Sequence, residues 1–149
     1  MRAAFVFAYL MEIRGKPEER PLNTYITGLT FFSKIDWHLR FELNTFEEFF
    51  KAFRALLGVH GVQADGENVK ASARRQFASI LRTTDELEKH IDLGLQLEAV
   101  RGTSARHPEI TLTEVVGMKL YCDLLITKIA QERLRQRDLE EADTRAMKQ

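Results

Sequence analysis

Residues 45–58 read TFEEFFKAFRALLG, and this stretch decides how the fold is interpreted. Its large apolar residues recur at helical spacing; they are Phe46, Phe49, Phe50, Phe53, Leu56 and Leu57. That spacing places them on one face of an α-helix, with charged residues on the opposite face. Gly58 supplies a stop signal, and burying each Phe contributes about 1.5–3 kcal/mol. We therefore predict an amphipathic helix over residues 46–57 in the centre of the core.

Three Thr-x-x-Glu patterns predict helix starts, because such pairs satisfy the first free backbone N–H groups of a helix. They are Thr45 with Glu48, Thr83 with Glu86, and Thr111 with Glu114. The second opens a predicted helix over residues 83–100, and the third opens another at residue 112. The helix that begins at residue 112 is predicted to be long. Its first part, residues 112–130, is apolar on nearly every side, which indicates a buried central element. Residues 131–149 continue it as a charged extension with five basic and five acidic side chains.

Two further segments complete this pattern, and one of them leaves an alternative open. Residues 67–82 predict another helix after the glycine-interrupted loop 58–66. In residues 3–43, Leu22, Tyr25 and Leu29 follow helical spacing, whereas residues 37–43 alternate like a strand. We predict a mainly α single-domain bundle over residues 1–149, with about five to six helices and a long C-terminal helix. The alternative is an α+β fold with antiparallel strands within residues 3–43.

Composition excludes several classes of protein. The chain has 149 residues, with 22 Lys and Arg against 22 Asp and Glu, so no global field attracts it to nucleic acid or acidic membranes. The apolar run 3–11 is shorter than the roughly 20 residues that span a bilayer, and it predicts a buried element. A single cysteine cannot form an intramolecular disulfide. We expect no membrane span, and a cytoplasmic or other reducing intracellular location.

The sequence contains no pattern typical of a catalytic or metal centre. The four histidines lie far apart, and no pair has metal-ligand spacing; they are His38, His60, His90 and His107. Cys122 falls within the apolar C-terminal helix, where a thiol behaves as a small hydrophobe. The glycines near residue 60 lack the Lys of a phosphate-binding loop. We therefore predict no enzyme activity, catalytic residue, metal or cofactor.

One cluster of cations suggests a second interpretation. If residues 67–82 are helical, four basic side chains fall within about 140° of arc; they are Lys70, Arg74, Arg75 and Arg82. Such a face could contact phosphates in a small nucleic-acid-associated protein. The net charge of zero argues against this interpretation.

The favoured interpretation is a non-catalytic helical subunit for protein–protein interaction or assembly. It rests on the apolar core and on the charged extension, whose dense charges of mixed sign are typical of a solvated or partner-facing helix. The residues predicted to bind a protein partner or a second copy are Arg135, Arg137, Leu139 and Glu140. A third interpretation is an accessory subunit of a larger enzyme complex.

Overall fold

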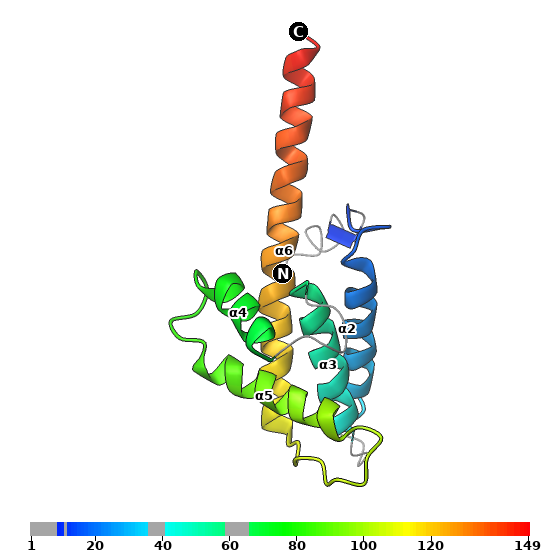
Figure 1. Cartoon of the computed structure of the whole chain (residues 1–149). Helices are drawn as coiled ribbons and strands as arrows, with labels where there is room; N and C mark the ends of the chain where they lie inside the picture. Colours follow the sequence, from blue (N-terminus) through cyan, green and yellow to red (C-terminus); the bar gives the residue numbers. More distant parts are fainter. Residues whose placement is uncertain (1–8, 11, 36–40, 59–65) are drawn as a thin grey trace.

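The computed structural model describes residues 9–10, 12–35, 41–58 and 66–149. These residues contain five helices in one bundle and no strand (Figure 1). The helices are α2 (Glu19–Phe32), α3 (Glu42–Leu56), α4 (Gly66–Phe77), α5 (Asp85–Val100) and α6 (Leu112–Met147). The predicted mainly α bundle with a long C-terminal helix is confirmed.

Helix α3 lies at the centre of the bundle and packs against α2, α5 and α6. The four Phe of its predicted apolar face are at most 2% exposed. Leu57, just after the helix, is also buried, and Leu56 is half-buried. The predicted face of this helix is therefore the core face, as its spacing indicated.

Two glycines let neighbouring helices approach the rings of α3 closely. A Cβ on Gly28 of α2 would lie 2.6 Å from the ring of Phe49. A Cβ on Gly94 of α5 would lie 2.5 Å from the ring of Phe50. Both distances are shorter than carbon atoms tolerate, so each ring occupies the space that a larger residue would need. These two contacts set the spacing of α2 and α5 from α3.

Helix α6 has a narrower buried face than its sequence predicts. Its buried residues form one stripe; they are Val115, Met118, Cys122, Leu125, Ile126 and Ala130. Leu112, Val116 and Leu120 are 45%, 48% and 53% exposed. The prediction that residues 112–130 are buried on nearly every side is therefore wrong, because neighbouring helices cover only part of α6.

The three predicted capping boxes have different outcomes. Thr111 and Glu114 form one at the start of α6, where the Thr111 N–H donates to the Glu114 carboxylate at 2.9 Å. Thr45 instead lies inside α3, which already begins at Glu42, and its hydroxyl is buried. Helix α5 begins at Asp85, after Thr84 rather than Thr83, and the Thr84 hydroxyl donates to Glu88 at 2.7 Å. The two predicted boxes at Thr45 and Thr83 are wrong.

The remaining predictions for local structure are settled in part. The predicted helix 67–82 is wrong at its end, because α4 stops at Phe77 and a turn follows. Within the described part of residues 3–43, α2 is helical and no strand forms. Residues 36–40 of the alternating stretch lie outside the described residues, as do residues 59–65 of the predicted loop. So does most of the run 3–11, although Tyr9 at its end is buried.

Candidate interaction surface

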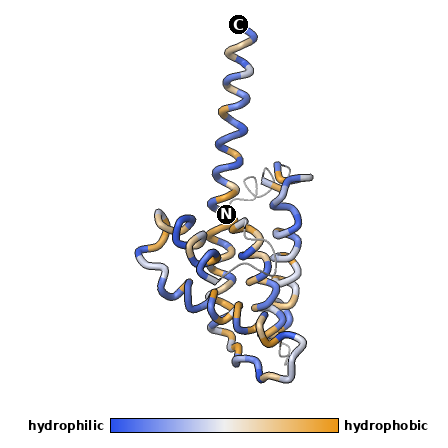
Figure 2. Tube along the Cα trace, viewed as in Figure 1, coloured by the Kyte–Doolittle hydropathy of each residue, from blue (hydrophilic) through white to orange (hydrophobic). Residues whose placement is uncertain are grey.

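The second half of α6 leaves the bundle and projects beyond it (Figure 1). Ala130 is the last buried residue of the helix, and all of residues 131–149 are described and none is buried. The helical part of this C-terminal extension is about 25 Å long at about 1.5 Å per residue. Figure 2 shows it as hydrophilic over most of its length, with isolated apolar positions. Beyond Arg137, every residue of the extension is exposed to solvent.

An ion pair braces the base of the extension against the bundle. The Arg133 guanidinium lies 2.7 Å from the carboxylate of Glu18, just before α2, and both side chains are largely buried. Nearby Tyr9 has its pKa raised to about 12, first by burial and then by the charge of Glu18. Salt screens a shielded ion pair less than an exposed one. This contact therefore holds α6 to the bundle at the point where the helix leaves it.

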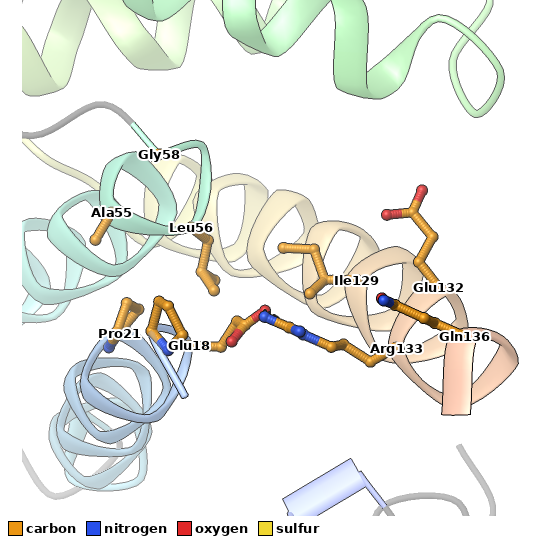
Figure 3. A pocket seen from close by; sticks show the side chains of 10 residues that line it. Glu18, Pro21, Ala55, Leu56, Gly58, Ile129, Glu132, Arg133 and Gln136 are labelled. Atoms are coloured by element: carbon orange, nitrogen blue, oxygen red, sulfur yellow. Dashed lines mark hydrogen bonds and ion pairs between the residues drawn. The ribbon is translucent and has the colours of Figure 1, made fainter. Parts of the chain in front are cut away.

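A hollow of about 350 Å³ lies beside this ion pair. Its walls come from the start of α2, the end of α3 and the middle of α6, and Glu18 and Arg133 point toward one another across it (Figure 3). Ile129 and Leu56 supply apolar wall, and Gln136 of the extension lines its edge. Arg133 pairs with one carboxylate oxygen of Glu18, whose other oxygen is buried without a hydrogen-bond partner. Glu132, which also lines the hollow, lies 3.9 Å from Lys128.

The four residues predicted to bind a partner all lie on the extension, but not on one face of it. Arg135 and Leu139 share one side, because residues four apart lie one above the other on a helix. Arg137 lies nearly opposite them and contacts Asp138 at 3.2 Å and Glu141 at 3.6 Å. Glu140 accepts a hydrogen bond from Gln136 at 3.1 Å. The structure thus brings together only Arg135 and Leu139, and partner binding by all four stays a prediction.

The predicted basic face of α4 pairs with α5 through two of its four cations. Lys70 lies 2.7 Å from Asp92, and the hydrogen bond to that carboxylate raises the lysine pKa. Arg74 pairs with Glu88, whose pKa is lowered first by this hydrogen bond and then by that of Thr84. Two of the four cations therefore hold α4 to α5.

The other two cations of that cluster are not side by side on the helix. Arg75 donates to the Ser72 hydroxyl at 3.1 Å. Arg82 is exposed, but it follows the end of α4 and does not extend the predicted helical face. Nucleic-acid binding by this cluster stays a prediction, with fewer cations available on one face than the sequence indicated.

Among the residues that the structure describes, the potentially reactive side chains do not converge on a site. Cys122 is fully buried, donates to the Phe49 carbonyl at 3.2 Å, and has its pKa raised by burial, which disfavours the thiolate. His90 contacts the Glu86 carbonyl at 2.7 Å rather than its carboxylate, which pairs with Lys89. Among the described residues, no group of three or more His, Cys, Asp or Glu could hold a metal ion.

The sequence analysis missed one surface feature of α6. Leu112, Val116 and Leu120 form an exposed apolar stripe, although they were predicted to be buried. Their spacing of four residues was a visible signal that they share one face. The sequence could not show that, within the described part of the chain, these three side chains stay exposed.

Comparison of the chain with protein-family models, curated proteins and solved structures gives no match. In the described part of the chain, no helix is both long and apolar enough to cross a membrane.

Proposed function

We propose that this chain is a non-catalytic helical subunit that binds a protein partner, or a second copy of itself, through the C-terminal extension. The observation that supports this most directly is the continuation of α6 beyond Ala130, its last buried residue. An isolated helix of this length is only marginally stable in water. Exposed ion pairs add only about 0–1 kcal/mol each, so a binding partner is a better explanation for the extension.

The first half of α6 makes the extension suitable for this role. Its buried stripe anchors the helix in the core, and the pair between Glu18 and Arg133 braces the point of exit. A helix started by a folded core does not have to nucleate on binding, so a partner meets a surface that is largely ordered in advance. The same proposal places the protein in the cytoplasm or another reducing compartment, where the lone Cys122 thiol stays reduced.

A truncated chain tests the proposal. The variant lacks residues 136–149 and keeps Arg133, so the brace to Glu18 is retained. We expect its melting temperature to stay within about 3 °C of the full chain, because the deleted residues bury almost nothing. Self-association in sedimentation, or capture of a specific partner identified by mass spectrometry, should be lost.

Two outcomes would contradict the proposal. A large fall in melting temperature would mean that the extension belongs to the core. Unchanged melting with unchanged association would mean that the extension is a solvated helix end without a binding role.

A further inference from the structure

Three exposed apolar residues of the extension form one narrow seam, whereas Met147, which is 87% exposed, lies on another side. Leu139, Ala142 and Ala146 follow each other at spacings of three and four residues, and all are exposed. Arg135 precedes them by four residues on the same side, and its aliphatic stem can cover apolar surface. This alternation of three and four is the spacing by which one helix packs along another in a coiled coil.

Long and short side chains along this seam fit closely against the same seam of an antiparallel second copy. In the antiparallel register that places Leu139 opposite Ala142 of a second copy, symmetry also places Ala142 opposite Leu139 of that copy. Arg135 then lies opposite Ala146 of the second copy. Every long side chain meets a short one, which is the condition for two packed faces to fill space without voids.

The charges beside the seam distinguish this register from the others. Asp138 and Arg145 flank the seam on one side, and Gln136 and Asp143 flank it on the other. In the antiparallel register, Asp138 of each copy lies beside Arg145 of the other, and Gln136 lies beside Asp143 of the other. A parallel pair would place Asp138 beside Asp143, and antiparallel registers shifted by one heptad would place Asp138 or Arg145 beside its own equivalent. Like charges at these positions disfavour a pairing.

The length of the extension also fits this register. Met147 of one copy lies level with Leu134 of the other, one residue beyond Arg133, which pairs with Glu18 of the bundle. The two bundles therefore lie at opposite ends of the paired helices.

We infer that the extension binds the extension of a second copy of this chain, antiparallel, with Leu139 against Ala142 and Asp138 against Arg145. This inference rests on the proposed function and names the partner. It assigns the contact to Arg135 and Leu139 of the predicted residues, and leaves Arg137 and Glu140 on the outer side of the pair.

Charge reversal and its rescue test this inference in the full chain. Asp138→Arg brings two pairs of arginines together, and Arg145→Asp brings two pairs of aspartates together. We expect each variant to weaken the dimer in sedimentation equilibrium by roughly tenfold or more. The double variant Asp138→Arg/Arg145→Asp restores both opposite-charge contacts and should return the dissociation constant to near that of the original chain.

Matched controls and a direct readout of direction complete the design. Glu140→Arg and Lys148→Asp make the same changes in charge away from the seam, so neither should weaken the dimer. Mixing an Asp138→Cys variant with an Arg145→Cys variant should give a disulfide between 138 and 145 on mild oxidation, because the native Cys122 is fully buried. Circular dichroism checks that each variant stays helical.

Three results would overturn the inference: a chain that stays monomeric at millimolar concentration, a dimer indifferent to these reversals, or cross-linking of 138 to 138 in place of 138 to 145. The proposed function would survive any of them if truncation at residue 135 still abolished capture of a different protein partner. It would fail separately if truncation changed no association at all.

Discussion

Phe50 of α3 and Gly94 of α5 show how single residues set the distance between helices. The ring lies against the glycine so closely that a Cβ there would stand 2.5 Å from three ring atoms. The spacing of the phenylalanines predicts which face of α3 is buried. It does not predict which glycine each ring meets, because that contact joins residues 44 positions apart and depends on how the helices pack.

The ring of Phe50 should therefore contribute heavily to stability. Phe50→Ala leaves a cavity between α3 and α5, and we expect the free energy of unfolding to fall by about 3–5 kcal/mol. The melting temperature should fall by roughly 10 °C. Thermal unfolding followed by circular dichroism measures this loss. An unchanged melting curve would show that this face of α3 is not the core.

Gly94→Ala tests the other side of the same contact. An alanine raises helix propensity by about 1 kcal/mol over glycine, whereas overpacking a tight core contact costs about 1–3 kcal/mol. Because the obstacle is the buried ring of Phe50, we expect the clash to prevail and the melting temperature to fall. The control is Gln96→Ala on the exposed side of the same helix, which should be nearly neutral. A more stable Gly94→Ala variant would contradict this packing.

At the scale of elements, charged side chains join α4 to α5. Arg74 and Lys70 of α4 reach Glu88 and Asp92 of α5, and the Thr84 hydroxyl also donates to Glu88. The sequence shows the cations at helical spacing, but their acidic partners lie 14 or more positions away. The basic face predicted from the sequence of α4 is thus partly a contact between α4 and α5. Only the packed structure distinguishes cations that pair with a neighbouring helix from cations that face solvent.

Glu88 makes this contact sensitive to acid. Its pKa is lowered in the folded chain by Arg74 and Thr84, so its contribution to stability is present above the ordinary carboxyl value of 4.5. The contribution is lost as the pH falls through the lowered pKa of the folded state. We expect Glu88→Gln to lower the melting temperature at pH 7 and to make it fall less between pH 5 and about pH 3. Parallel curves for the two proteins across this range would contradict the assigned contact.

The helix starts show why local sequence predicts some boundaries and not others. The Thr111 and Glu114 pair follows the non-helical residues 101–110, and both hydrogen bonds of its capping box form, so the local signal decides where α6 begins. Thr45 follows Leu43, which packs against the core, and α3 begins early enough to include Leu43. A tertiary contact thus overrides a capping signal worth about 1 kcal/mol.

On the scale of the whole molecule, α6 is both a core element and the projecting arm. Its sequence predicts this division well, because the buried stripe ends at Ala130 and charged residues follow on most sides. The sequence does not predict the brace at the exit point, since Glu18 and Arg133 are 115 positions apart. Nor does it show which side of the first half stays uncovered, where Leu112, Val116 and Leu120 are exposed.

This division predicts a gradient of hydrogen exchange along one continuous helix. Amides between Val115 and Ala130 lie in the packed core and should open only with global unfolding, whereas those from Leu139 to Met147 can fray locally. In dilute solution, we expect the second group to exchange roughly a thousandfold faster than the first. Exchange followed by mass spectrometry of peptides resolves the two halves.

The concentration dependence of hydrogen exchange distinguishes an extension that pairs with a second copy from one that is a solvated helix end. If the extension pairs with a second copy, protection around Leu139 and Ala146 should rise with protein concentration, while protection between Val115 and Ala130 stays constant. The Asp138→Arg variant should show no such rise, and its double variant with Arg145→Asp should recover it. Equal protection along all of α6 in dilute solution would contradict the division at Ala130, because only a helix covered by its own bundle would protect its tip without a partner.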